Sequence, residues 1–239
     1  MALYTISGKG KLPALPFFAG IQIEECFDAG LLARMGTTTV SEVRRRWANE
    51  HVAFVACFNN QPAAFGWMAR TTAAIGELNH ELTLPVGNRY LWNFRTLAAY
   101  RGRGIYPALL QHMIRYEVHN TNRFWIIHAP ENQSSMKGIR KAGFQYVGKL
   151  YTNRSGIACI EHTRAAGTFR RLLEEMGFRI AAGEPASRWN CSSSHFKKVI
   201  PDGKDTVKSA VGDVFQSMRR RASNFAIQDT AAAGTIAGS

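Results

Sequence analysis

A strand, a loop rich in glycine and arginine, and a helix follow one another between residues 89 and 117, and this element constrains the fold most strongly. RYLWNFRTL (89–97) is an apolar, aromatic run typical of a buried strand. Beyond the loop, Ile105, Leu109 and Met113 recur at helical spacing, and Pro107 stands where a first helical turn tolerates proline. The sequence therefore predicts a domain in which helices pack on a sheet.

The connecting loop, Arg101-Gly102-Arg103-Gly104, has the chemistry of an anion site. Its glycines let the backbone approach a ligand closely, and the first N–H groups of a helix favour negative charge. Arg101 and Arg103 add charged donors suited to phosphate. We expect a phosphate or pyrophosphate site here; a tight turn with two exposed arginines is the alternative. Neither the P-loop pattern nor the acidic residue of a Rossmann fingerprint is present.

The elements around this loop complete a mixed α/β pattern. Residues 22–50 are expected to be helical with a break at 36–39, and Ser41 is the expected N-cap of the second helix. The other predicted elements are strands at 52–58, 63–71 and 124–129, a helix at 132–144, and a hairpin of strands 144–151 and 156–163.

Composition limits the classes of protein. With 46% hydrophobic and 20% charged residues, the chain is globular rather than disordered or collagenous. No uninterrupted apolar stretch is long enough for a membrane span, and no secretory signal is evident, so we expect a cytoplasmic protein. The four cysteines lack zinc-site or redox spacing, which predicts no metal and cysteines that act as small buried hydrophobes.

Basic residues gather toward the C-terminal half of the chain. The formal net charge is +13; residues 1–120 carry 12 basic and 8 acidic residues, whereas residues 121–239 carry 18 and 9. Amphipathic helices are expected at 168–178 and 204–221, and the Ala/Gly/Ser/Thr-rich end has the composition of disorder. We therefore divide the chain into a main domain (1–163), a partly helical basic extension (164–221) and a disordered tail (222–239).

Two segments at matching separation identify a family. TLAAYRGRGIYPALL (96–110) and NQSSMKGIRKAGF (132–144) resemble the R/Q-x-x-G-x-G/A loop and the Asn…Gly-Phe helix of the GNAT superfamily of acetyl-CoA-dependent N-acetyltransferases. The element order from about residue 20 to 163 also fits. The resemblance implies an α/β fold with a mixed sheet (α+β), the acyl-CoA N-acyltransferase fold, in which a central pair of strands splays apart, followed here by the basic C-terminal extension.

The resemblance also implies acetyl-CoA as the acetyl donor and assigns residues to it. Backbone groups of the strand end would bind the pantetheine arm and polarise the thioester, the loop would cradle the pyrophosphate with Arg101 bracing it, and Asn132 would contact the donor near its reactive end. The implied cofactor-binding residues are Phe94, Arg95, Thr96, Leu97, Arg101, Gly102, Arg103, Gly104, Ile105, Tyr106, Asn132 and Ser135.

Two departures from the family pattern affect the site. Tyr106 replaces the last glycine of the loop, where its side chain is expected to narrow the cradle. Ile139 stands where many members carry a tyrosine that protonates the leaving thiolate, and the strand at 89–97 has no carboxylate to act as base. The remaining acid–base candidates are His128, Glu81 and Tyr146, with Glu77 and Tyr151 nearby in sequence.

Three functions stay open at this point. The first is transfer of an acetyl group from acetyl-CoA to a primary amine by direct attack. The acceptor would be a small molecule, a protein N-terminus or a lysine, and the enzyme could form a homodimer. The second is a CoA-binding module without catalysis, because the usual tyrosine and strand carboxylate are missing. The third is a basic nucleic-acid-binding protein, which lacks any zinc-finger, RNP-type or long basic motif to support it.

Overall fold

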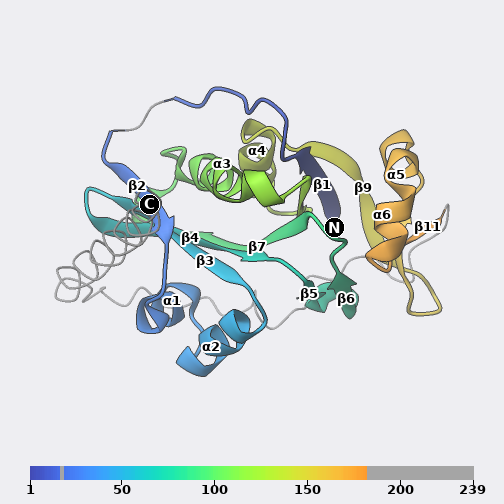
Figure 1. Ribbon diagram of the computed structural model, residues 1–239, viewed down its shortest axis with the longest axis horizontal. Helices are drawn as coiled ribbons and strands as arrows, with labels where there is room; N and C mark the ends of the chain where they lie inside the picture. The colour runs from blue at the N-terminus through green and yellow to red at the C-terminus, as the bar shows by residue number, and fades with distance from the viewer. Residues whose placement is uncertain (17–18, 182–239) are drawn as a thin grey trace, which may run out of the picture. The chain divides into compact units, whose positions relative to one another are not determined.

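Nine strands form one mixed sheet in the residues that the computed structural model describes, which are 1–16 and 19–181. All of these residues belong to one compact unit, Met1–Lys198. The strand order is β11-β10-β9-β1-β8-β7-β4-β3-β2 (Figure 1). The strands are β1 (Ala2–Ser7), β2 (Ile21–Glu25), β3 (Val52–Phe58), β4 (Gln61–Ala69), β7 (Asn88–Thr96), β8 (Arg123–His128), β9 (Gln145–Thr152), β10 (Ala158–Glu161) and β11 (Arg179–Ala181).

Helices cover both faces of the sheet (Figure 1). On one face, α3 (Ile105–Glu117) and α4 (Gln133–Lys141) cover the centre, and on the other face lie α1 (Ala29–Gly36) and α2 (Val40–Ala48). A separate hairpin of β5 (Thr72–Ile75) and β6 (His80–Thr83) precedes β7. Short 3₁₀ turns, η1 (Gly76–Leu78), η2 (Ala98–Tyr100) and η3 (Val118–Asn120), complete the connections.

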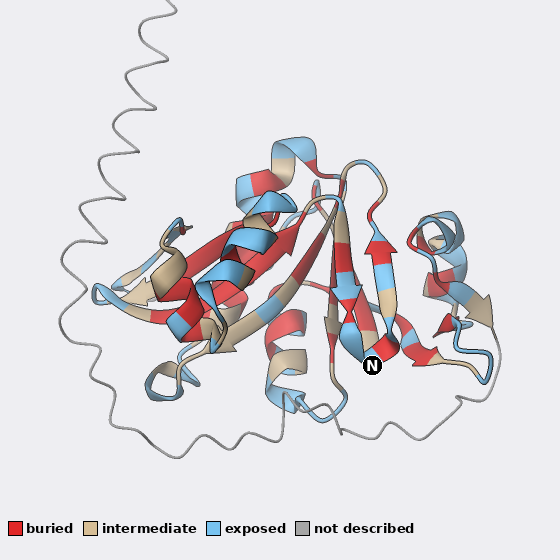
Figure 2. Ribbon diagram, turned by 90° about the horizontal axis from the view of Figure 1, so that it is seen from below, coloured by how far each residue is buried: buried red, intermediate tan, exposed pale blue. Residues whose placement is uncertain are grey.

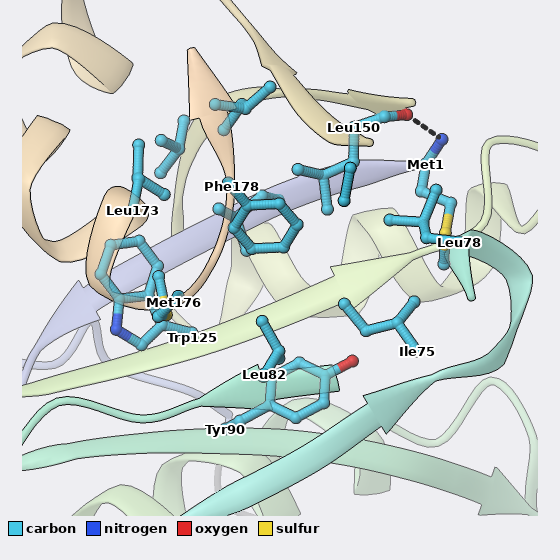
Figure 3. Close-up of a cluster of buried hydrophobic side chains, with 14 of the residues drawn as sticks. Met1, Ile75, Leu78, Leu82, Tyr90, Trp125, Leu150, Leu173, Met176 and Phe178 are labelled. Atoms are coloured by element: carbon cyan, nitrogen blue, oxygen red, sulfur yellow. Dashed lines mark hydrogen bonds between the residues drawn. The ribbon is translucent and has the colours of Figure 1, made fainter. Parts of the chain in front are cut away.

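The core has two parts. One part joins α3 and α4 to the sheet, with Leu109, Met113 and Ile139 against Phe124 and Ile126 of β8. The other part joins the β5–β6 hairpin and the C-terminal helices to the opposite face through residues such as Leu82, Tyr90, Trp125, Leu173 and Phe178 (Figure 3). Burial is nearly continuous in β3 and β4, whereas it alternates along the edge strand β2, as expected where only one face is covered (Figure 2).

The mixed α/β fold with a splayed strand pair is confirmed, and so are most central elements. The strand predicted at 52–58 matches β3, and the predicted helix after Gly104 matches α3. The N-cap of α2 is Thr39 rather than Ser41, because the Thr39 hydroxyl accepts the Glu42 N–H at 3.1 Å. Helical structure was expected from residue 22, and this is wrong: IQIEE alternates in burial and pairs with β3 as strand β2.

Two further strand regions escape the sequence pattern. β1 lies between β8 and β9, so a segment from the start of the chain fills the middle of the sheet. The connection before β7 contains the β5–β6 hairpin, which the Gly/Pro-marked sequence did not indicate. Both strands of that hairpin are short, and short strands give too few residues for a clear alternation.

Residues 164–181 continue the same sheet. The single helix expected at 168–178 is divided into α5 (Arg164–Thr168) and α6 (Arg170–Glu175), and β11 then pairs parallel to β10. The guanidinium of Arg123 lies 4.2 Å from the ring centre of Phe169, which fixes these helices against β8. The division of the chain at residue 163 stays a prediction. The expected helix at 204–221, the expected tail at 222–239 and Cys191 lie outside the described residues.

Candidate active site

The parallel strands β7 and β8 separate halfway along their length. Paired residues run from Asn88↔Arg123 to Leu91↔Ile126, and the ladder stops there although β7 continues to Thr96 and β8 to His128. β7 stays paired with β4 on its other side through Ala64↔Thr96. Within residues 1–16 and 19–181, no strand pairs with this edge of β7 beyond Leu91, which leaves peptide groups free to bind an extended ligand.

A β-bulge in β7 accompanies this separation. The pairing with β4 shifts between Phe65↔Arg95 and Trp67↔Trp92, so that Asn93 and Phe94 face the single residue Gly66. Asn93 has a positive φ of 51°, and a Cβ on Gly66 would overlap the ring of Phe94. Glycine at 66 thus gives the Phe94 ring room to pack beneath the bulge.

The peptide groups after the bulge divide between two edges of the strand. The Leu97 N–H donates to the Ala63 carbonyl of β4 at 2.9 Å, and the Leu97 carbonyl accepts from the Tyr100 N–H. The Leu97 N–H is therefore occupied within the sheet, and its carbonyl already accepts one hydrogen bond. Because alternate residues of a strand direct their peptide groups to opposite edges, Thr96 and Phe94 face the open edge.

Arg95, the remaining residue of this predicted set, has a structural contact. Its Nη1 donates to the Thr37 hydroxyl at 2.6 Å and to the Met35 carbonyl at 3.1 Å. The side chain therefore ties β7 to the turn between α1 and α2. If Arg95 binds a ligand, it does so through its backbone groups.

The loop after β7 has the geometry of an anion cradle. Gly102 and Gly104 have positive φ values of 78° and 71°, which only glycine adopts at little cost. Among the described residues, no hydrogen bond involves the N–H groups of residues 102–106, whereas the Ala108 N–H already bonds within the helix to the Gly104 carbonyl. Five consecutive free N–H groups at a helix N-terminus suit a pyrophosphate.

The two loop arginines differ in their contacts. Arg101 Nε donates to the Thr96 carbonyl at 3.2 Å and so braces the loop, in the position predicted for it. Arg103 stacks on Phe58 and Tyr100, with its guanidinium carbon 5.2 and 6.0 Å from the two ring centres. Its side chain is thereby held at the loop by stacking on these two rings.

Tyr106 does not narrow the loop. Its ring packs edge-on against Phe94 with centres 5.3 Å apart, and it lies where a Cβ on Gly138 would be. Its hydroxyl lies 3.3 Å from the Ser135 Oγ, and burial raises the pKa of this phenol. The Tyr106 side chain therefore packs between α3 and α4, and only the backbone N–H of Tyr106 belongs to the cradle.

Asn132 begins α4 as its N-cap. The Asn132 Oδ1 accepts from the Ser135 N–H at 3.0 Å and from the Ser134 hydroxyl at 2.9 Å. Asn132 and Ser135 therefore stabilise the N-terminus of α4 through this hydrogen bond. From the sequence, both residues were predicted to bind the acetyl donor, and capping of the helix was not predicted. Ser135 also contacts the Tyr106 hydroxyl, which connects the start of α4 to the helix that follows the cradle.

His128 ends β8 at the open half of the strand pair. It is buried, and its Nδ1 lies 2.7 Å from the Ala129 carbonyl oxygen, so Nδ1 carries the proton and Nε2 the lone pair. Burial lowers the pKa of His128, which keeps the imidazole neutral near pH 7. A neutral, oriented imidazole is a suitable proton acceptor.

Tyr4 and Tyr146 lie beside His128. The Tyr4 ring centre is 5.4 Å from that of His128 and 5.6 Å from that of Tyr146. The Tyr146 hydroxyl donates to Glu161 at 3.1 Å, and burial followed by Glu161 raises the pKa of Tyr146 to about 12. Tyr146 therefore stays protonated and cannot serve as a base. Tyr4 was missed because β1 itself was missed.

The other acid–base candidates come from the β5–β6 hairpin, with its η1 turn, and from β9. Glu81 is exposed on β6, opposite Ala74. Glu77, in η1, contributes to the raised pKa of Tyr90 after the larger effect of burial, so it lies nearer β7. The Tyr151 hydroxyl donates to the Ala181 carbonyl at 3.0 Å and belongs to the contact of β9 with β11. Ile139 is fully buried, as its apolar side chain requires.

Within residues 1–16 and 19–181, no helix is long and apolar enough to cross a membrane. The same part of the chain holds no group of three or more His, Cys, Asp or Glu side chains arranged to bind a metal ion.

Comparison with known proteins connects this geometry to a family. Residues 23–144, about half of the chain, match the acetyltransferase (GNAT) family. This range contains the splayed strand pair, the cradle and α4, but neither β1 nor the hairpin that carries Tyr146. No curated protein sequence matches the chain.

Solved structures of low sequence identity share parts of the fold. An N-acetyltransferase from Kribbella flavida is 16% identical, with a TM-score of 0.44 over 61% of this chain and 53% of its own, so the chain spans about half of that protein. An aminoglycoside 6′-N-acetyltransferase from Acinetobacter baumannii is 19% identical, with a TM-score of 0.40 over 53% and 91%. A predicted acetyltransferase from Clostridium acetobutylicum, solved with acetyl-CoA, is 18% identical, with a TM-score of 0.37 over 52% and 90%.

Proposed function

Because the chain belongs to the acetyltransferase (GNAT) family, we propose that it transfers an acetyl group from acetyl-CoA to a primary amine. The observation that carries the proposal is the open half of the β7–β8 pair, which leads directly into five free N–H groups at the start of α3. An extended thioester with a pyrophosphate at one end matches both features in order along the chain.

The chain's own groups account for donor binding. The N–H groups of residues 102–106 would bind the pyrophosphate, with Arg101 bracing the loop and Arg103 adding charge. Peptide groups of Thr96 and Phe94 at the open edge of β7 would hold the pantetheine arm. A peptide N–H aimed at the thioester oxygen would stabilise the negative charge that develops there.

In the proposed reaction the amine nitrogen attacks the thioester carbonyl carbon. A C–N bond forms, the C–S bond breaks, and the CoA thiolate leaves while the amine loses one proton. His128 is the group that we assign to receive that proton, through Nε2, because it is neutral, oriented by Ala129 and placed at the end of the open half of β8. Glu81 is exposed, and Tyr146 is held protonated.

The acceptor is a primary amine on a small molecule, a protein N-terminus or a lysine. A CoA-binding module without catalysis is the second candidate, favoured by Ile139 at the position where a proton donor is usual. The expected homodimer and cytoplasmic location stay predictions. Nucleic acid as a partner is the least supported, because the clearest basic motif is the cradle at the α3 N-terminus.

Thermal unfolding and thiol release test the proposal together. Acetyl-CoA at about 100 times its dissociation constant should stabilise the fold by about 2.7 kcal/mol and raise the Tm. Thiol release with a panel of amines then separates an enzyme from a binding module. No Tm shift at millimolar acetyl-CoA would overturn the proposal, and a Tm shift without thiol release for any amine would favour the binding module.

A further inference from the structure

Arg46 of α2 reaches across to the bulge of β7. Its guanidinium carbon lies 5.1 Å from the ring centre of Trp67 and 4.6 Å from that of Trp92. With the Asn93 amide oriented so that its oxygen faces the guanidinium, that oxygen accepts from Nη1 at 2.6 Å and Nη2 at 3.3 Å. We call Arg46, Trp67, Trp92 and Asn93 the Arg46 cluster.

The charge of Arg46 is already balanced within the fold. Its Nε donates to Glu42 at 2.9 Å, and only 11% of its side chain is exposed. Hydrogen bonds from Arg45, with a further contribution from Arg46, lower the pKa of Glu42 to about 2, so this carboxylate stays charged. A guanidinium that is paired, stacked and mostly buried serves the protein's own structure rather than a ligand anion.

The group that Arg46 holds is the one that gives β7 its shape. Asn93 is the bulge residue with φ 51°, a left-handed conformation that a residue with a side chain keeps only where surrounding contacts maintain it. Loss of the bulge would shift the register of the following residues against β4 and would turn the peptide groups of Phe94 and Thr96 away from the open edge. The side-chain contact with Arg46 opposes that shift.

We propose that Arg46 is a positioning residue, which maintains the bulge and thereby orients the peptide groups that bind and polarise the thioester. The inference rests on the proposed acetyl transfer. Beside the cluster, the Trp92 Nε1 and the Nδ1 of His51, whose ring lies edge-on to Trp92 at 5.3 Å, are buried without hydrogen-bond partners in the described residues.

Arg45 offers a matched control one residue away. It pairs with the same Glu42 through Nε at 2.8 Å and Nη2 at 3.0 Å, but 67% of its side chain is exposed. Arg45→Met and Arg46→Met therefore both remove hydrogen bonds to Glu42, and only Arg46→Met releases Asn93.

Calorimetric titration with acetyl-CoA and steady-state kinetics on the full chain test the inference. Arg46→Met should lower kcat roughly 10-fold to 100-fold, as expected for misplacement by a fraction of an ångström, and weaken acetyl-CoA binding as well. Arg45→Met should stay within about twofold of the wild type, because a solvent-exposed ion pair contributes little. Equal kcat and affinity in the two variants would overturn the inference.

A second variant keeps the test decisive if Arg46→Met fails to fold. Asn93→Ala removes the acceptor of the Arg46 hydrogen bonds but keeps a Cβ, so the positive φ of the bulge loses the contact that maintains it. Its kcat should fall as well, and the double variant should lose little more than either single one, since both act on one contact. A wild-type kcat in Asn93→Ala, or fully additive losses, would overturn the inference. A wild type that neither binds acetyl-CoA nor releases thiol would instead overturn the proposed function.

Discussion

The two strands that border the open gap contribute to it in different ways. β7 supplies peptide groups, and its shape depends on a bulge, on Gly66 behind it and on the loop that follows. β8 supplies a side chain, His128, whose surroundings come from β1 and β9. Donor binding therefore depends mainly on backbone geometry along one continuous segment, whereas proton transfer depends on side chains gathered from distant parts of the chain.

This difference predicts which property of the enzyme, donor binding or reaction rate, a substitution on each strand should change. A change on the β7 side should alter binding of acetyl-CoA, because the binding groups are N–H groups held by local conformation. A change on the β8 side should alter the rate and its pH dependence, while binding stays close to that of the wild type. The following predictions test that separation, beginning with the largest expected effect.

His128→Gln should produce the largest loss. Glutamine cannot take up a proton, and removal of a general base costs about 10²-fold to 10⁴-fold in rate. Because burial lowers the pKa of His128, the wild-type kcat should be constant near neutral pH and fall only below pH 6.5, as the imidazole becomes protonated. Measurement of kcat against pH at saturating amine checks both the loss and the disappearance of this acid limb.

His112→Gln is the control for this prediction. His112 on α3 is half-buried, and its pKa is likewise lowered by burial, but its ring packs on Phe54 away from the gap. It should keep the wild-type rate and pH profile. An unchanged acid limb in His128→Gln would show that another group receives the proton.

Gly102→Val should have the next largest effect, on binding. At φ 78° a branched side chain forces the loop to rearrange, and loss of two charge-assisted hydrogen bonds of about 1.5 kcal/mol each weakens acetyl-CoA binding about 100-fold. Gly156→Val is a close control, since Gly156 has φ 77° and, like Gly102, open space where a Cβ would lie. Both variants should lower the Tm similarly; similar acetyl-CoA affinity in both, by calorimetry, would place the cradle elsewhere.

Gly66→Ala should have the smallest effect of the three, on stability first. The added methyl group would overlap the Phe94 ring, and overpacking of this kind costs about 1–3 kcal/mol. Denaturant unfolding measures the loss, with Gly76→Ala as control because a Cβ at Gly76 meets open space. Equal stability of the two variants would show that the bulge tolerates a side chain behind it.

The same contrast explains how much the sequence could predict. The cradle and α4 are each formed by one contiguous segment, and their glycines and capping asparagine act through local backbone geometry. The resemblance to the family implied a bracing role for Arg101, whose Nε donates to the Thr96 carbonyl. The sequence did not show that the Leu97 N–H points toward β4 whereas Thr96 faces the open edge. The direction of each peptide group depends on how β7 pairs with β4.

Clusters of side chains were harder to predict from the sequence than these local segments. Tyr4 lies on a strand that the hydrophobic pattern did not reveal, and its contact with His128 joins residues that are far apart in the sequence. Arg46 belongs to a run of three arginines typical of an exposed helix face, and nothing in that run separates it from Arg45. Burial of one arginine against two tryptophans is set by tertiary packing, which local sequence does not encode.

A crystal structure of the wild type with acetyl-CoA tests the central claim most directly. The account predicts the pyrophosphate within hydrogen-bonding distance of the N–H groups of residues 102–106, and the pantetheine arm between β7 and β8 in contact with the Thr96 backbone. It also predicts the acetyl group on the side of the gap that His128 can reach. Acetyl-CoA bound elsewhere, or a β7–β8 pair that stays free of ligand at saturating concentration, would contradict it.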